Sequence, residues 1–182
     1  MEIELAKASR KDTPVLRRLY ELYCHDFSEF THSDVGDNGL YTDDLFLTGY
    51  WREPGWSAFL VTADSRLAGF AWVLKTTIFT PGSAECDQLA QAGLLQGEHI
   101  LMEEFFILRK YRRQGLGLRV AQQLFDRFPG VWEVSEMIEN TPAQAFWRKV
   151  IARYTAGRYI EMQLETDLWR GPVQVFRSPG VV

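Results

Sequence analysis

The chain has 182 residues, of which 46% are hydrophobic and 14% aromatic, a composition typical of one globular domain with a full core. Its formal net charge of −4 excludes a broad basic surface for nucleic acid. No stretch approaches the roughly eighteen apolar residues of a membrane span, and Glu2, Glu4 and Lys7 stand where a signal peptide would be apolar, so we expect a cytoplasmic protein without a membrane partner.

The two cysteines, Cys24 and Cys86, do not have the spacing of a metal-binding or redox motif. Free thiols in a reducing compartment are the simplest interpretation, so we expect no bound metal. Neither a repeat nor a long linker divides residues 1–182, which predicts a single domain. Whether the chain forms a homodimer stays open.

A strand and a helix are predicted at the N-terminus. Residues 2–6 alternate apolar and polar side chains, which is typical of a short strand. Thr13 and Pro14 then open an amphipathic helix. Its predicted inward side consists of Val15, Leu16, Leu19, Leu22, Tyr23 and Phe27. The next predicted elements are a loop at 35–39, a helix at 42–50 and a turn at 53–55.

A hairpin is predicted in the middle of the chain. Residues 56–62 and 67–77 are rich in apolar side chains and are joined by a short polar turn at 63–66. Residues 81–97, rich in Gly, Ala and Gln, are the least informative segment, with at most a short helix. Residues 100–108 are apolar apart from two glutamates and predict a buried strand.

A cluster of cations and a glycine turn follow that strand. Five cations occur within eleven residues, namely Arg109, Lys110, Arg112, Arg113 and Arg119. Gly115 and Gly117 form the turn, and Pro129 ends the amphipathic helix after it. The predicted inward side of this helix consists of Leu116, Val120, Ala121, Leu124, Phe125 and Phe128.

The last third predicts a strand at 131–138, another helix and a closing antiparallel pair. Thr141 can cap the helix, Pro142 suits its first position, and Gln144 completes a capping box. The helix has an apolar stripe of Ala143, Phe146, Trp147, Val150 and Ile151. The closing strands are predicted at 158–165 and 173–176. Together these elements indicate a mixed α/β fold, a sheet with flanking helices.

The glycine turn before a helix predicts an anion site. Glycine permits unusual backbone dihedrals, and the first amide N–H groups of a helix have no partner within it. These amides and the helix dipole attract phosphate oxygens. A P-loop is excluded because its spacing and its Lys-[ST] pair are missing, and a dinucleotide fingerprint is excluded because Val120 stands where the third glycine belongs.

The remaining pattern is R-x-x-G-x-G, formed by Arg112, Gly115 and Gly117, with Ile107 five positions before the arginine. It resembles the acetyl-CoA signature of the GNAT superfamily of N-acetyltransferases. The segment Asn140, Ala143, Phe146, Trp147 and Lys149 is similar to the family's N-x-x-A-x-x-F-Y-x-K segment. The specific resemblance covers residues 99–154 and implies a twisted, mostly antiparallel sheet.

The resemblance also implies how acetyl-CoA, the co-substrate, is bound. The loop amides would hold its diphosphate while nearby cations, Lys110 among them, screen the charge. The pantetheine arm would pair with the exposed edge of the strand that ends near Leu108, and Asn140 would contact the same arm. The implied cofactor-binding residues are Phe106, Ile107, Leu108, Arg112, Arg113, Gln114, Gly115, Leu116, Gly117, Leu118, Asn140, Phe146 and Trp147.

Acetyl transfer to an amine needs a general base. Members of the family often place a Glu or His four or six residues before the position of Ile107, and Glu103 stands at minus four. Alternation puts Glu103 on one face of the strand and Glu104 on the other. We predict Glu103 as the base, Glu104 as the second candidate, and His99, on the same face as Glu103, as a proton relay.

Two interpretations of the general acid are open. The family usually has a Tyr after the Phe of its F-Y pair, whereas this chain has Trp147, whose indole N–H has no proton to give up at useful pH. Either the thiolate leaves unassisted, or another tyrosine approaches it. Tyr154, about two helical turns later on the same face, is the candidate, with a purely structural role as the alternative.

The resemblance implies that the acceptor is a primary amine of a small molecule or a peptide, and the sequence does not identify it further. Acidic and histidine side chains that suit a cationic amine occur before the second strand, but helix caps and solvated loops explain them equally well. They are His25, Asp26, Glu29, His32, Asp34, Asp37, Asp43 and Asp44. Because Trp147 replaces the usual tyrosine, a non-catalytic acyl-CoA-binding module is the alternative to an enzyme, and nucleic-acid binding through the arginine cluster is a third hypothesis.

Overall fold

The computed structural model describes residues 1–42, 51, 54–76, 87, 89–166 and 169–179. Most of the predicted 42–50 helix, Glu53 of the predicted turn, and Cys86 lie outside these residues. Within them, the strands are β1 (Ile3–Lys7), β2 (Trp56–Ala63), β3 (Arg66–Thr76), β4 (His99–Ile107), β5 (Gly130–Ser135), β6 (Ile160–Glu165) and β7 (Arg170–Ser178). The helices are α1 (Thr13–Thr31), α4 (Leu116–Arg127) and α5 (Thr141–Thr155), with short 3-10 turns η1 (Arg10–Asp12) and η2 (Arg109–Tyr111).

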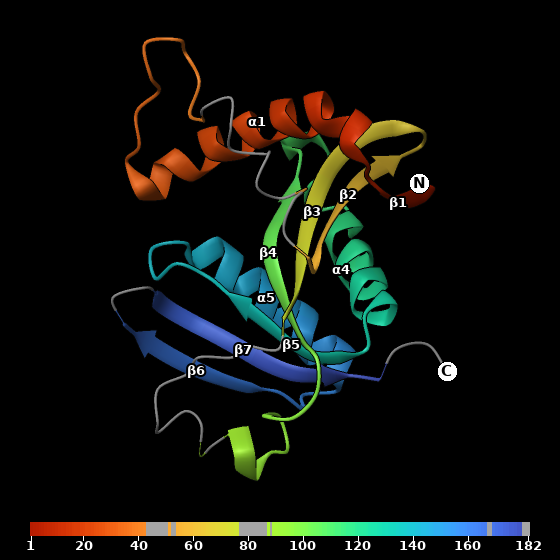
Figure 1. Ribbon diagram of the computed structural model, residues 1–182, viewed down its shortest axis with the longest axis vertical. Helices are drawn as coiled ribbons and strands as arrows, with labels where there is room; N and C mark the ends of the chain where they lie inside the picture. Colours follow the sequence, from red (N-terminus) through yellow and green to blue (C-terminus); the bar gives the residue numbers. More distant parts are fainter. Residues whose placement is uncertain (43–50, 52–53, 77–86, 88, 167–168, 180–182) are drawn as a thin grey trace.

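The strands form one twisted sheet in the order β1-β2-β3-β4-β5-β7-β6 (Figure 1). Every neighbouring pair is antiparallel except β4 and β5. This confirms the predicted mixed α/β fold with a mostly antiparallel sheet. The hairpin between β2 and β3 is also confirmed, and its turn places Asp64 and Ser65 at positive φ.

The parallel pairing of β4 and β5 is short. It runs only from His99↔Val131 to Leu101↔Glu133, after which the two strands diverge. β4 continues for six more residues without pairing to β5. The sheet therefore opens in its middle, and this opening positions the site described below.

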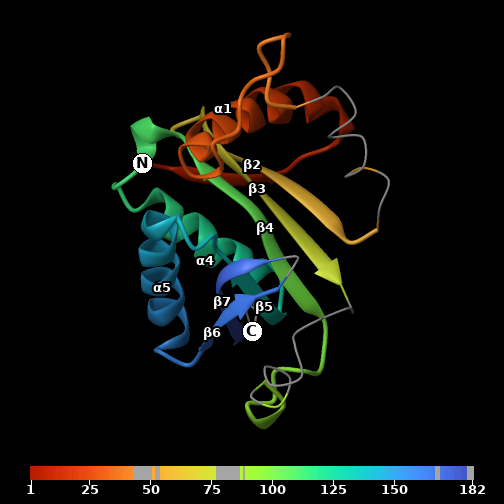
Figure 2. The same cartoon turned by 90° about the vertical axis from the view of Figure 1, so that its left-hand side faces the viewer.

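Helices cover both faces of the sheet (Figure 2). α1 packs through Leu16 and Leu19 on the face that presents Phe70, Trp72 and Phe106. α4 and α5 pack on the opposite face, over a larger core. Residues of α4 in that core include Leu116, Val120, Ala121, Leu124 and Phe125, which confirms the predicted inward side apart from Phe128, which is only partly buried.

Two sequence predictions about helices were wrong. Leu22, predicted inward on α1, is 49% exposed, because the stripe that faces the sheet follows Leu16, Leu19 and Tyr23, and Leu22 lies about 100° from Tyr23 around the helix. The cap of α5 is Asn140, whose Oδ1 accepts a hydrogen bond from the Ala143 amide at 3.1 Å.

The residues around that cap explain two further differences. Thr141 is the first helical residue, since Asn is the stronger N-cap. Gln144 forms no capping box and instead donates from Nε2 to the carbonyls of Met137 and Ile138. β5 accordingly ends at Ser135, three residues before its predicted end.

Candidate active site

The loop between β4 and α4 presents free backbone amides. The first backbone hydrogen bond of α4 runs from the Arg119 amide to the Gly115 carbonyl at 3.2 Å. Within the described residues, no hydrogen bond engages the amides from Arg113 to Leu118. Arg113 (φ 60°) and Gly115 (φ 80°) adopt left-handed backbone conformations, which turn the chain into the helix. This arrangement is suited to binding an anion.

The two glycines of the motif serve different purposes. A Cβ on Gly115 would meet nothing within 4 Å, so this position needs glycine only for its positive φ. A Cβ on Gly117 would lie 3.2 Å from the ring of Phe146 and 3.7 Å from Ile107. Gly117 therefore allows α4 to pack closely against α5 and β4, a role in packing that the sequence did not indicate.

Arg109 and Arg112 are already paired with α1. The Arg112 Nε donates to the Ile107 carbonyl at 2.7 Å, and its guanidinium also bonds to Asp26. Arg109 bonds to the other Asp26 oxygen at 2.8 Å. Burial alone would raise the pKa of Asp26, but these two guanidinium groups outweigh it and hold the pKa below its ordinary value. Asp26 is thus paired with two arginines of the loop, whereas Arg113 is exposed.

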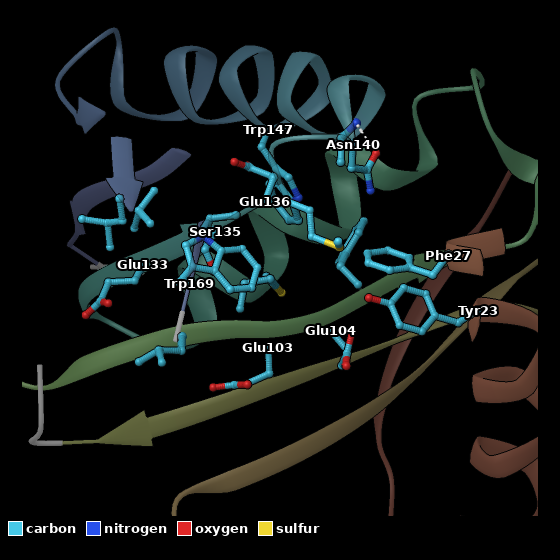
Figure 3. Close-up of a pocket in the computed structure, with 18 residues that line it drawn as sticks. Tyr23, Phe27, Glu103, Glu104, Glu133, Ser135, Glu136, Asn140, Trp147 and Trp169 are labelled. Atoms are coloured by element: carbon cyan, nitrogen blue, oxygen red, sulfur yellow. Dashed lines mark hydrogen bonds between the residues drawn. The ribbon is translucent and has the colours of Figure 1, made fainter. Parts of the chain in front are cut away.

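A cavity of about 520 Å³ lies where β4 and β5 diverge (Figure 3). It reaches from α1 on one side to α5 and β7 on the other. Four glutamates line it, and no Lys, Arg or His among the described residues does. Its wall consists of Tyr23, Phe27, Leu101, Met102, Glu103, Glu104, Phe105, Glu133, Val134, Ser135, Glu136, Met137, Asn140, Ala143, Trp147, Leu164, Trp169 and Val173.

Glu103 lies at a β-bulge. Opposite it on β3, Trp72 pairs with Glu104 and Val73 with Met102, so that Glu103 is the extra residue. The bulge breaks strict alternation along β4 and points a half-buried carboxyl at the cavity. Burial raises the pKa of Glu103, so its carboxylate is a stronger base than that of an exposed glutamate.

Glu104 faces α1. The Tyr20 hydroxyl donates to its Oε1 at a long 3.4 Å, and the phenol of Tyr23 interacts with the same carboxyl. Burial raises the pKa of Glu104 to about 7, the charge of Glu103 adds to this rise, and the two tyrosine hydroxyls oppose it. The adjacent glutamates of β4 therefore occupy different surroundings.

His99 does not line the cavity. It is buried, its Nδ1 lies 3.0 Å from Glu133 Oε1, and its Nε2 lies 3.3 Å from the Leu95 carbonyl. Glu133 does line the cavity, and burial, followed by the charge of Glu103, raises its pKa to about 8. The bulge lies between Met102 and Glu104, beyond His99, so it does not separate His99 from Glu103. His99 is set apart by its contacts with Glu133 and the Leu95 carbonyl, outside the cavity.

The helix α5 brings Asn140 and Trp147 to the cavity. The Oδ1 of Asn140 is used as the helix cap, which leaves its Nδ2 group as a donor beside the cavity. Trp147 packs edge-on against Phe105 and Phe146, with ring centroids 5.0 Å apart in both pairs. Phe146 itself covers Gly117 and does not line the cavity.

Tyr154 lies away from the cavity. Its hydroxyl donates to Asp126 at 2.8 Å and lies 2.9 Å from the Ser178 hydroxyl, between α4 and β7. Its ring packs on Phe125 and Phe176. These contacts are those of a core tyrosine, the alternative that the sequence left open.

Several cavity residues were not singled out from the sequence as site residues. Glu133 and Glu136 stand in an otherwise apolar strand segment, and a carboxylate at such a position is a signal that could have been used. Tyr23 was predicted only as a core residue, and Trp169 had no local signal. The acidic and histidine residues proposed for the acceptor do not line the cavity in the described part of the chain, and Asp43 and Asp44 lie outside it.

The described residues contain no group of three metal-binding side chains, and none of their helices is both long and apolar enough to cross a membrane. Cys24 is a free thiol. A comparison with curated protein sequences found no match.

Solved structures with the same fold are numerous. An acetyltransferase from Thermus thermophilus superposes with a TM-score of 0.63 at 16% identity, covering 97% of both chains. The ribosomal-protein-S18-alanine N-acetyltransferase of Escherichia coli gives 0.55 at 11% identity, covering 100% of this chain and 97% of its own. An aminoglycoside 6′-N-acetyltransferase of Acinetobacter baumannii gives 0.55 at 13%, covering 82% and 89%. These likenesses show the fold.

The family itself follows from the sequence model of the acetyltransferase (GNAT) family, which matches residues 16–151. That span includes most of α1, the β4 strand with its bulge, the glycine loop and most of α5. The free amides and the opening between β4 and β5 lie within it. The chain therefore belongs to the GNAT family of acetyltransferases.

Proposed function

We propose that this protein, acting as one catalytic domain, transfers the acetyl group of acetyl-CoA to a primary amine of a small molecule or peptide. The observation that supports this most is the juxtaposition of free amides at the start of α4 with an acidic cavity in the opening between β4 and β5. The free amides suit a diphosphate, and the acidic cavity suits an ammonium group.

Acetyl-CoA would bind with its diphosphate on the amides from Arg113 to Leu118. Arg113 and Lys110 would screen its charge, since Arg112 is held by Asp26 and the Ile107 carbonyl. The pantetheine arm would follow the unpaired edge of β4, with the Nδ2 of Asn140 as a hydrogen-bond donor and Trp147 as an apolar wall. The thioester, when bound, supplies the activated acetyl group.

The acceptor would enter the cavity as an ammonium ion. Its wall has four glutamates against no described cation, which favours a positively charged group over an anionic one. Glu103 would remove a proton, so that the free amine can attack the thioester carbonyl. Its raised pKa and its place at the bulge support this role.

A panel of amines tests the proposal. Kanamycin, spermidine, lysine and an alanine-initiated peptide would each be incubated with acetyl-CoA, and release of free thiol would be followed. We expect turnover with at least one cationic amine and none without protein. Absence of turnover, together with absence of acetyl-CoA binding, would contradict the proposal.

A non-catalytic acyl-CoA-binding module remains the second candidate, because Trp147 occupies the position where the family usually has tyrosine. It predicts acetyl-CoA binding without thiol release from any amine. Turnover in the panel excludes it.

A further inference from the structure

The proposed reaction releases the thiolate of coenzyme A, and neither Trp147 nor Tyr154 can protonate it. The indole of Trp147 cannot lose a proton at useful pH, and the Tyr154 hydroxyl is engaged with Asp126 and Ser178 between α4 and β7. A donor must therefore come from another element that reaches the cavity.

α1 supplies a phenol at the cavity wall. Tyr23 lines the cavity, and its ring is held edge-on by Phe70 and Phe106, with centroids 5.9 Å and 5.8 Å away. Its hydroxyl points toward the cavity near Glu104 (Figure 3). Burial raises the pKa of Tyr23 well above its ordinary value. The phenol therefore keeps its proton unless another group supplies a replacement.

Glu104 can supply that proton. Its carboxyl also lines the cavity, and it interacts with the Tyr23 and Tyr20 hydroxyls. Its pKa of about 7 leaves much of it protonated at neutral pH, and this acid is stronger than a thiol, whose ordinary pKa is about 8.5. Transfer of a proton from Glu104 to a departing thiolate is thus downhill.

Neighbouring carboxyls in different surroundings commonly divide the roles of acid and base. Glu103, at the bulge, is the less buried of the two and has no tyrosine partner in the described residues. Glu104 is enclosed by α1 and remains protonated to higher pH. The structure separates one base from one acid on consecutive residues of β4.

We propose that Glu104 and Tyr23 together form the general acid that protonates the sulfur of coenzyme A as it departs. This rests on the proposed function. The acceptor ammonium gives one proton to Glu103, and its nitrogen forms the N–C bond. The C–S bond then breaks, Tyr23 gives its proton to sulfur, and Glu104 gives its own to Tyr23. The amide nitrogen loses its second proton, which restores Glu104, and Glu103 releases one proton to solvent.

Few charged or titratable groups in the described part of the chain face Glu104. They are Tyr20, Tyr23 and Cys24 on α1 and Glu103 on β4, and the β3 residue paired with Glu104 is the uncharged Trp72. A titration of Glu104 near neutral pH would therefore change the electrostatic surroundings of the two phenols first. Only Tyr23 of these two lines the cavity, whereas the Tyr20 ring is stacked on Trp72 at 4.8 Å.

NMR of protein labelled with ¹³C at the tyrosine ζ carbon tests the contact without any acceptor. The Tyr23 signal, assigned with Tyr23→Phe, should shift with a midpoint near pH 7, and Glu104→Gln should abolish that shift. A Tyr23 signal that does not change between pH 5 and 9 would overturn the proposal, even if the protein is an active acetyltransferase.

Kinetics with the fastest amine of the panel test the role. We expect kcat to fall about 100-fold in Glu104→Gln and about 10-fold in Tyr23→Phe, with the KM for acetyl-CoA little changed. In the wild type kcat should decline as pH rises through about 7, and Glu104→Gln should lack this decline. Tyr20→Phe, the matched control, removes a phenol from the same carboxyl but not from the cavity wall, so its effect should stay below about 3-fold. Equal effects of Tyr20→Phe and Tyr23→Phe, or an unchanged pH profile in Glu104→Gln, would overturn the proposal.

Discussion

The two parts of the proposed site, here called the coenzyme side and the acceptor side after the ligands we propose for them, are built differently. The coenzyme side consists of main-chain amides from one short segment, residues 113–118, set by two left-handed backbone conformations. The acceptor side consists of side chains from distant segments, among them Tyr23, Glu104, Glu133 and Trp169. Binding at the coenzyme side should therefore depend on backbone conformation and tolerate side-chain changes. Activity at the acceptor side should depend on side chains and tolerate small changes of the backbone.

The largest expected effect lies on the acceptor side. Glu103→Gln should lower kcat by about 100-fold to 1,000-fold, because the variant keeps the shape of the side chain but cannot accept a proton. Acetyl-CoA affinity, measured by calorimetry, should stay within about 2-fold, since the diphosphate is proposed to bind at the amides before α4 and not at Glu103. Glu165→Gln, at the exposed last residue of β6, is the control. Retained turnover in Glu103→Gln would show that Glu103 is not the general base.

A pair of glycine variants tests the coenzyme side. Gly115 and Gly157 have nearly the same backbone angle, φ 80° and 79°, and a Cβ on either would meet nothing within 4 Å. Replacement of either by alanine should cost about 1 kcal/mol of stability from left-handed strain. Only Gly115→Ala should also weaken acetyl-CoA binding, by about 10-fold, because relief of the strain moves the amides. Equal affinities in the two variants would contradict this view of the loop.

The same difference explains what the sequence could predict. The coenzyme side is contiguous, so the strand, cations, glycines and helix were all visible in order between Ile100 and Phe128. Even there, the packing role of Gly117 depends on Phe146 of another helix, and the pairing of Arg112 depends on Asp26 of α1. Such contacts across the fold leave no local pattern.

The acceptor side was less predictable for the same physical reason. Alternation along β4 placed Glu103 and Glu104 on opposite faces, but a bulge opposite Trp72 and Val73 breaks that alternation, and both carboxyls line the cavity. A bulge depends on the neighbouring strand, so the sequence of β4 alone does not predict it. The insertion of β7 between β5 and β6 brings Trp169 to the cavity, and only the tertiary fold decides this. The sequence placed Tyr154 on the same side of its helix as Trp147, but the Tyr154 hydroxyl donates to Asp126 on α4.

Glu136, in the wall of the cavity, should make the stability of the fold depend on pH. Burial, partly offset by a hydrogen bond from Gln174, raises the pKa of Glu136 to about 8. The folded state therefore keeps a proton on Glu136 that the unfolded state releases near pH 4.5. Glu136 thus lowers the free energy of unfolding as pH rises from about 4.5 to 8. Glu136→Gln should be more stable than the wild type at pH 9, on the order of a few kcal/mol, and equal to it at about pH 5. Denaturant unfolding at both pH values checks this, and a difference that does not depend on pH would refute it.

The smallest expected effect concerns the link between the two sides. Asp26 joins α1 to Arg109 and Arg112, and its pKa lies below its ordinary value. The pairing therefore stabilises the fold above about pH 4 and is lost as pH falls through the lowered pKa. Asp26→Asn should lower Tm modestly at pH 7, by a few degrees, and hardly at all at about pH 2.5. Asp34→Asn, in an exposed loop, should change neither value, and an equal loss in both variants would argue against the pairing.

The central claim is that the free amides before α4 bind the diphosphate of acetyl-CoA. The most direct test is a ¹H–¹⁵N spectrum of the protein titrated with acetyl-CoA. The amide signals from Arg113 to Leu118 should show the largest shifts and saturate at about one equivalent of coenzyme. If acetyl-CoA leaves these signals unchanged, or shifts only those of other segments, the account of this loop is wrong.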